Sequence, residues 1–125
     1  ESLLTAMSLC VMAARAYGLI VLDGVYNDFK DEVGLERECL QAQAFGFDGK
    51  TLIHPSQLQM TNQVFSPSRE ALAEAEEIVA VFEATENAGK GVLTIDGKMV
   101  EHLHYQQSKR LLDVAEQIRA LEMQT

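Results

Sequence analysis

Two short apolar runs each end at a polar residue: Gly18-Leu19-Ile20-Val21-Leu22-Asp23-Gly24 and Gly49-Lys50-Thr51-Leu52-Ile53-His54-Pro55. Continuous apolar runs of this length are typical of strands buried on both faces, as in a parallel sheet. A helix-length segment separates the two runs, and parallel strands need such a crossover. Because ligands of parallel α/β folds bind beyond the carboxyl ends of the strands, Asp23 and His54 are the first candidate site residues.

The composition argues against several classes of protein. The 125 residues include ten basic and nineteen acidic side chains, and the resulting net charge of -9 argues against a nucleic-acid partner. No segment is apolar for long enough to cross a membrane. Cys10 and Cys39 lie in helix-like stretches and form no metal-type cluster. We therefore expect both to be reduced thiols in the core of a cytoplasmic protein.

Hydrophobic periodicity predicts the elements around the two apolar runs. The strands are expected at about 19–22 and 51–53. Gly18 and Gly46 are expected to end the helices that precede these strands. Three longer helices are predicted from apolar stripes, which comprise Leu3, Met7, Cys10, Val11 and Ala14 in the first, Leu35, Cys39 and Ala42 in the second, and Leu72, Ala75, Val79 and Phe82 in the third.

The pattern changes in the second half of the chain. We expect Ser66 to cap the third of these helices, with Pro67 as its first helical residue. Asp96-Gly97 separates two apolar pieces within residues 91–100, which predicts a tight β-hairpin. A final amphipathic helix follows, with apolar positions at Leu103, Leu111, Val114, Ala115, Ile118 and Leu121.

The predicted strands are too few for a closed sheet. Strands that are buried on both faces need neighbours on both sides, which two parallel strands and a hairpin do not supply. A complete (β/α)₈ barrel takes about 250 residues. From this pattern we expect an α/β fold that forms the end of a larger domain.

Longer blocks of the sequence carry a resemblance to a known family. These blocks are Leu19–Tyr26, Gly46–Gln57, Val64–Ser68 and Gly97–Glu101. Together they look like the C-terminal portion of the citrate lyase beta chain family. That family includes malyl-CoA, methylmalyl-CoA and citramalyl-CoA lyases and is related to the HpcH/HpaI aldolases.

The resemblance implies a TIM barrel. Residues 1–88 would be its last βα units, and residues 89–125 a C-terminal lid made of the hairpin and the final helix. Members of the family cleave or form a carbon–carbon bond in a 3-hydroxyacyl-CoA thioester. They use Mg²⁺ held by a glutamate and an aspartate, with an arginine nearby, all on earlier strands. We therefore expect the metal ligands upstream, outside this chain, and none within it.

The resemblance also implies roles for residues of this sequence. In related lyases an aspartate of the C-terminal motif, often supplied by a neighbouring subunit, moves a proton. Glu101 matches that position with a side chain one methylene longer, which suggests a different substrate or a shift toward thioester hydrolysis. The resemblance therefore implies a homo-oligomer in which the C-terminal segment contacts a neighbouring subunit. The residues expected to contact the substrate or CoA are Asp23, Gly24, Val25, His54 and Pro55.

Each of these roles has a structural alternative. Glu101 would favour the N-terminus of the last helix through the helix dipole. Asp23 would be a turn residue that accepts local backbone hydrogen bonds. His54, followed by Pro55, would shape the exit of the second strand.

Two other functions are compatible with the sequence. One is that of a citrate lyase beta subunit, whose thioester is carried by an acyl carrier protein. The other is that of a non-catalytic fragment that assembles with a partner bearing the rest of the barrel.

Overall fold

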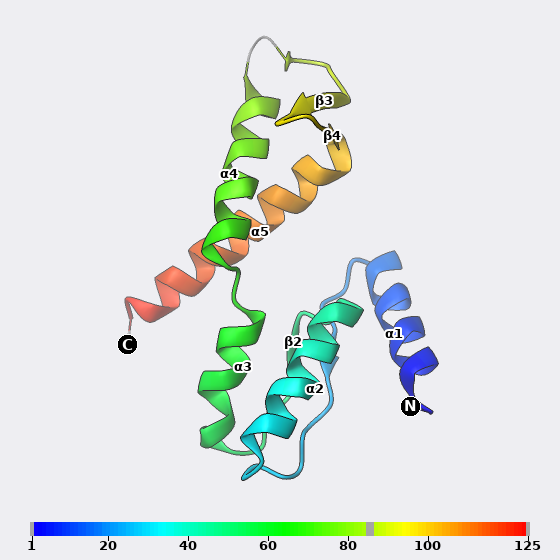
Figure 1. Cartoon of the computed structure of the whole chain (residues 1–125), viewed down its shortest axis with the longest axis vertical. Coiled ribbons are helices and arrows are strands. Elements are labelled where there is room, and N and C mark those ends of the chain that lie inside the picture. The colour runs from blue at the N-terminus through cyan, green and yellow to red at the C-terminus, as the bar shows by residue number, and fades with distance from the viewer. Residues whose placement is uncertain (1, 85–86, 125) are drawn as a thin grey trace. The chain divides into compact units, whose positions relative to one another are not determined.

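The computed structural model describes residues 2–84 and 87–124. The chain forms two compact units, Glu1–Ser66 and Pro67–Thr125 (Figure 1). The predicted division at residue 88, between the end of a barrel and a lid, refers to a longer fold and stays a prediction. Within the described ranges, no helix combines the length and apolarity that a membrane span requires.

The first unit contains a parallel strand pair joined by a helical crossover, as predicted. Leu22 of the first strand pairs with Gly49 of the second, and Asp23 pairs with Lys50. The elements in chain order are α1 (Leu4–Ala16), β1 (Leu22–Asp23), α2 (Glu32–Phe45), β2 (Gly49–Lys50), η1 (Pro55–Gln57) and α3 (Leu58–Phe65).

The predicted bounds of the strands were wrong, while their burial on both faces was expected in a larger sheet and stays a prediction. The paired residues are 22–23 and 49–50, not 19–22 and 51–53. The side chains of Leu19, Ile20 and Leu22 are exposed by 58%, 74% and 56%. Their exposure follows from the small sheet, because among the described residues β1 and β2 pair only with each other.

An arginine–aspartate clamp holds the amino-terminal side of this strand pair. Arg15, near the end of α1, donates to both carboxylate oxygens of Asp48 at 2.9 Å. The same guanidinium donates to the carbonyl of Gly46 at 2.6 Å, and Asp48 accepts the Val21 N–H at 2.9 Å. Gly46 ends α2 with φ of 98°, the left-handed conformation predicted for it. The clamp therefore joins α1, the end of α2 and the segment before β1.

The core of the first unit lies between its helices. Val11, Ala42 and Phe47 form a buried cluster. The predicted α2 face is confirmed, since Leu35, Cys39 and Ala42 are all buried. Cys39 contacts the Thr61 hydroxyl of α3 with its sulfur at 3.7 Å, and α2 and α3 lie side by side (Figure 1).

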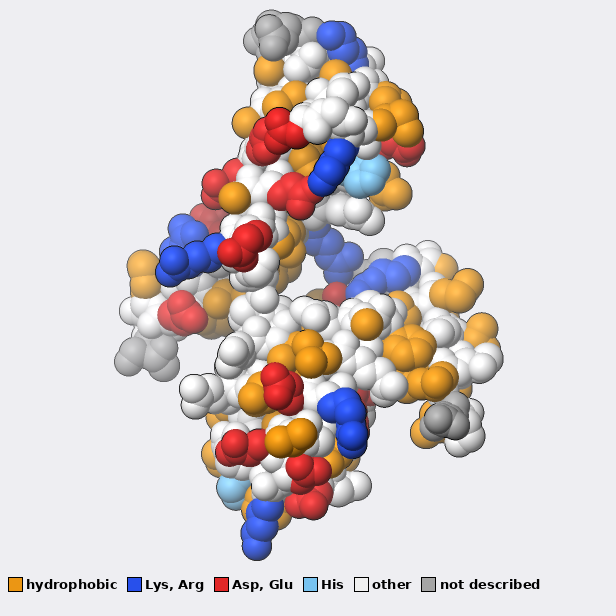
Figure 2. Space-filling view, in the orientation of Figure 1, with side chains coloured by type: hydrophobic (Ala, Val, Ile, Leu, Met, Phe, Trp, Pro, Cys, Tyr) orange, Lys and Arg blue, Asp and Glu red, His pale blue; other side chains and the backbone are white. Residues whose placement is uncertain are grey.

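The prediction of a second core thiol was wrong, because Cys10 is exposed. On α1 the buried positions are Val11 and Ala14. A helix turns by about 100° per residue, so Cys10, one position before Val11, lies toward the side. Hydrophobic side chains of α1 such as Leu9 and Met12 are also exposed, and orange atoms are visible over this helix in Figure 2.

The second unit packs two helices and a hairpin: α4 (Arg69–Glu83), β3 (Val92–Ile95), β4 (Lys98–Glu101) and α5 (His102–Glu122). The antiparallel hairpin is confirmed. Its two turn residues, Asp96 and Gly97, both have positive φ, 48° and 76°, as a tight turn of this type requires. The helices α4 and α5 pack against each other (Figure 1).

Two predictions for these helices need correction. Ser68, not Ser66, caps α4 by accepting the Ala71 N–H at 3.1 Å, because Ser66 already ends α3. In α5, Leu103 and Leu121 are 57% and 67% exposed instead of buried. Leu121 lies beyond the part of α5 that α4 covers, because α5 has 21 residues and α4 has 15. Leu103 lies about 200° around the helix from Tyr105, whose ring stacks on Phe82 of α4, so Leu103 faces away from α4.

Candidate functional site

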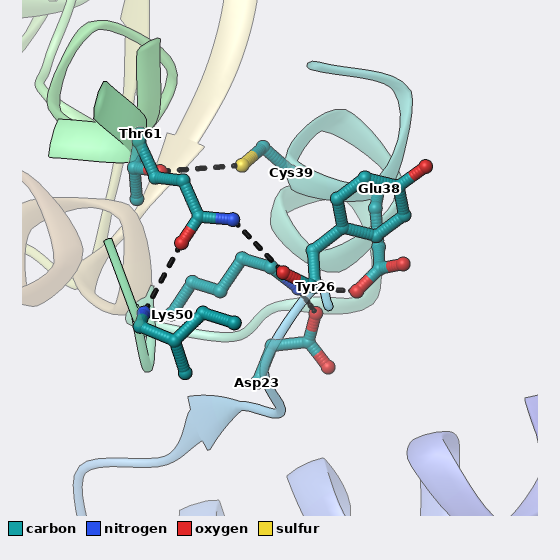
Figure 3. Close-up of polar contacts among 8 residues, drawn as sticks. Asp23, Tyr26, Glu38, Cys39, Lys50 and Thr61 are labelled. Atoms are coloured by element: carbon teal, nitrogen blue, oxygen red, sulfur yellow. Dashed lines mark hydrogen bonds and ion pairs between the residues drawn. The ribbon is translucent and has the colours of Figure 1, made fainter. Parts of the chain in front are cut away.

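The carboxyl ends of β1 and β2 are joined by a buried lysine. Lys50, the last residue of β2, has a side chain with no exposed surface. Its Nζ lies 2.8 Å from Oδ2 of Asp23, the last residue of β1, and also binds Oε1 of Glu38 on α2 (Figure 3). One ammonium thus links both strands to the helix between them.

The register explains this geometry. Asp23 and Lys50 are partners in the parallel ladder, so their side chains lie on the same face of the strands. Because Glu38 belongs to α2, this is the face that α2 covers. The structural alternative for Asp23 was a turn role with local backbone hydrogen bonds, but its side chain accepts a hydrogen bond from Lys50 at 2.8 Å.

The two carboxylates keep Lys50 charged. Burial, the largest single effect, lowers the pKa of Lys50, but the hydrogen bonds to Asp23 and Glu38 and their negative charges together outweigh it and raise the pKa. The ammonium is therefore protonated at neutral pH, and it neutralises the Oδ2 side of Asp23.

A buried glutamine fixes the loop that follows β1. The side chain of Gln57 is fully buried. Its Oε1 accepts the Ile53 N–H at 3.1 Å, and its Nε2 donates to the Tyr26 carbonyl at 2.9 Å. Tyr26 in turn donates its hydroxyl to Asp31, the N-cap of α2, at 2.7 Å. These bonds tie the loop after β1 to the segment that leaves β2.

His54 lies against the same loop. Its ring stacks on Phe29, with centroids 4.4 Å apart and planes 16° from parallel. Its Nδ1 accepts the Ser56 N–H at 3.2 Å, and Pro55 begins the short helix η1. His54 is exposed beyond these contacts. The structure therefore brings the residues that follow the two strands together at one edge, as the parallel topology predicts.

Other predicted site residues are placed as follows. Gly24 and Val25 directly follow β1 and are both exposed. Glu101 ends β4 in the other compact unit and is the N-cap residue of α5, where its N–H donates to His104 Nδ1 at 2.8 Å. Glu101 therefore lies at the start of α5, where a carboxylate can stabilise the N-terminus of the helix, which is its structural alternative. Its side chain is exposed.

Sequence reasoning missed Lys50 and Gln57 as site-building residues. The signal for Lys50 was a charged residue inside an otherwise apolar run, which must be paired if it is buried. For Gln57 the local pattern offered no comparable signal, because its two backbone partners lie on either side of α2 in the chain.

The described residues do not assemble a metal site. Across residues 2–84 and 87–124, no three His, Cys, Asp or Glu side chains group in a way that could hold an ion. Asp23 and Glu38 come together, but a lysine ammonium lies between them. These two carboxylates do not fit a bound cation, and the ligands of any Mg²⁺ must be other residues.

Comparison with known proteins identifies the family. A family model described as a C–C bond lyase of the TIM-barrel fold matches residues 3–118. The chain belongs to this family. The resemblance found in the sequence is confirmed, and with it an α/β enzyme family of the TIM-barrel fold.

Several curated proteins are similar to the chain over nearly its whole length. A (3S)-malyl-CoA thioesterase of Cereibacter sphaeroides is 51% identical over 95% of the chain and 42% of its own length. Human mitochondrial citramalyl-CoA lyase is 38% identical over 94% of the chain and 34% of its own length. The citrate lyase beta subunit of Leuconostoc mesenteroides is 34% identical, over 92% and 38%. The chain thus spans well under half of these relatives.

A solved structure has the same fold. The protein CitE of Mycobacterium tuberculosis, crystallised with magnesium, acetoacetate and coenzyme A, superposes with a TM-score of 0.74. It is 31% identical and covers 93% of the chain, which corresponds to 42% of CitE.

We predict that Lys50→Met destabilises the first unit in a pH-dependent way. At neutral pH the loss should be about 3–5 kcal/mol, since two carboxylates lose their buried partner. The folded-state pKa of Lys50 is raised above 10.5, so its contribution is complete below pH 10.5 and is lost as the pH rises through the folded value. Denaturant unfolding of wild type and variant from pH 7 upward measures both effects.

The matched control for this experiment is Lys30→Met, which removes the same charge from an exposed position. It should change the free energy of unfolding by less than about 0.5 kcal/mol. Equal unfolding curves for the two variants would contradict the role assigned to Lys50.

Proposed function

We propose that the protein carrying this chain acts on a CoA thioester of a 3-hydroxy acid of the malyl-CoA class. The observation that carries this proposal is the 51% identity, over 95% of the chain, to a malyl-CoA thioesterase. Similarity to a citramalyl-CoA lyase and a citrate lyase beta subunit supports the same substrate class, since malyl, citramalyl and citryl groups are all hydroxy acids.

The reaction we propose first is cleavage of the carbon–carbon bond between the hydroxyl-bearing carbon and the carbon next to the thioester. The hydroxyl loses its proton and becomes a carbonyl. The electron pair of the broken bond passes to the thioester enolate, which is then protonated. For malyl-CoA the products are glyoxylate and acetyl-CoA. A bound Mg²⁺, whose ligands we expect outside this chain, would stabilise the developing oxyanion charge.

A second reaction, hydrolysis of the thioester, is favoured by the names of the malyl-CoA thioesterase relatives, which are 51–53% identical. Here water attacks the thioester carbonyl and the carbon–sulfur bond breaks, which yields malate and free CoA. A carboxylate that accepts a proton from the water would serve this reaction.

The chain's own residues would act around the substrate. We propose that Glu101 moves the proton in either reaction. At the carboxyl ends of β1 and β2, the Asp23 carboxyl group is held in place by the Lys50 ammonium, and its oxygens suit a hydrogen-bond donor of the substrate. The remaining proposed contacts come from the segments after the two strands, namely Gly24, Val25, His54 and Pro55.

We also propose that the longer protein is a homo-oligomer in which residues 89–125 contact a neighbouring copy. Exposed hydrophobic side chains on α5 and at its C-cap support a covered surface there: Leu103, Leu121 and Met123.

Product analysis separates the candidate functions. Incubation of the complete protein with (3S)-malyl-CoA and Mg²⁺ should release glyoxylate and acetyl-CoA in equal amounts. Malate with an equal amount of free CoA would instead identify hydrolysis. Turnover of a hydroxyacyl group only when it is carried by an acyl carrier protein would indicate the citrate lyase beta function. No turnover of any of these thioesters would indicate a non-catalytic chain.

Glu101→Gln tests the proton-transfer role. The amide keeps the size of the side chain but cannot take up a proton, so kcat should fall by about a hundredfold while the KM for the thioester changes little. Glu101→Asp, which restores the family's usual carboxylate, is the matched control and should retain most of the rate. A Glu101→Gln enzyme with an unchanged kcat would leave only the helix-start role.

A further inference from the structure

The hydrogen bonds of His54 determine where its ring carries the proton. Nδ1 accepts the backbone N–H of Ser56 at 3.2 Å, and the Ser56 hydroxyl lies 2.8 Å from the same nitrogen. The same hydroxyl donates to the Phe29 carbonyl at 3.3 Å, so the backbone N–H of Ser56 is the contact that determines the state of Nδ1. A ring nitrogen that accepts a backbone N–H cannot itself be protonated. The neutral ring therefore holds its proton on Nε2.

The surroundings hold the ring in this orientation. Phe29 stacks on one face of the imidazole, and the backbone of Ser56 lies at the Nδ1 edge. Within the part of the chain that the structure describes, no hydrogen bond to Nε2 is present, and the residue is exposed. The Nε2–H group is thus an oriented donor at the edge where the segments after β1 and β2 meet.

We propose that His54 binds an acceptor oxygen of the acyl-CoA substrate through Nε2–H and does not act as a general base. The inference rests on the proposed function and adds to it which partner donates the hydrogen bond. The free nitrogen of the neutral ring already carries a proton, and the other nitrogen is used by Ser56, so the ring has no site for a substrate proton. In the hydrolysis alternative, His54 is therefore excluded as the group that activates water.

The acceptor oxygen has two sources with the same chemistry. It belongs either to the acyl part, as a carbonyl or carboxylate oxygen, or to CoA itself, as an amide or phosphate oxygen. Comparison of free CoA with the thioester distinguishes them.

Two substitutions separate the donor from the local structure. In His54→Asn the side-chain oxygen can still accept the Ser56 N–H, since asparagine is a favoured residue at this position before a helix, but its shorter NH₂ group does not reach the position of Nε2–H. In His54→Gln the longer amide returns an N–H donor near the Nε2 position. We expect His54→Asn to raise the KM for malyl-CoA by about tenfold with a smaller change in kcat, and His54→Gln to recover much of this loss.

The measurements are made on the complete protein. Steady-state kinetics give kcat and KM for malyl-CoA, and calorimetry gives the Kd for CoA. A weaker Kd for CoA in His54→Asn places the acceptor on CoA, and a loss confined to malyl-CoA places it on the acyl part. Unchanged values for both ligands would overturn the proposal.

The tautomer is tested without any ligand. Long-range proton–nitrogen correlation spectra of the histidine rings, with the His54 signals assigned by their loss in His54→Asn, should show a protonated Nε2 and an unprotonated Nδ1. The opposite tautomer would overturn the inference. A protein that binds CoA but turns over no thioester would contradict the proposed function alone, while weaker CoA binding by His54→Asn would still support the contact.

Discussion

The ammonium of Lys50 is buried between the carboxylates of Asp23 and Glu38, and this arrangement constrains the whole first unit. A buried cation is costly unless it is paired and hydrogen-bonded. Removal of the ammonium or of a carboxylate leaves the remaining group with an uncompensated charge. Since β1 and β2 pair over only two residues each, the ladder alone specifies their register weakly. The ion pair specifies it further, because a shift of one residue would turn Asp23 or Lys50 to the opposite face.

The same constraint positions the candidate site. With the register fixed, the segments after both strands leave at one edge, where Gln57 connects them through two backbone hydrogen bonds. The stack of Phe29 on His54 completes the connection. The segments after the two strands are thus held by the ion pair on the face that α2 covers and by the hydrogen bonds of the loop itself. A candidate site at the ends of the strands agrees with the general arrangement of barrel enzymes, in which strand ends carry the chemistry.

Much of this arrangement could be predicted from local sequence. The stripe of Leu35, Cys39 and Ala42 predicted the buried face of α2, Gly46 its end, and Asp96-Gly97 the hairpin. The strand bounds could not be found in this way, because pairing depends on the partner strand and not on the length of an apolar run. Leu19 and Ile20 are exposed in this chain, since two strands cannot cover both of their own faces, and their burial in a larger sheet stays a prediction. The partners of Lys50 were also beyond local reasoning, since Glu38 and Asp23 are 12 and 27 residues away in the chain.

A double-mutant cycle between Asp23 and Lys50 tests the central claim most directly. The free energies of unfolding of wild type, Asp23→Asn, Lys50→Met and the double variant would be measured in the complete protein at neutral pH. We predict that the double variant loses less free energy of unfolding than the two single variants lose together. The difference, which is the coupling energy, should be at least about 1 kcal/mol. Losses that add to within about 0.5 kcal/mol would contradict the claim that this ion pair holds the two strands in register.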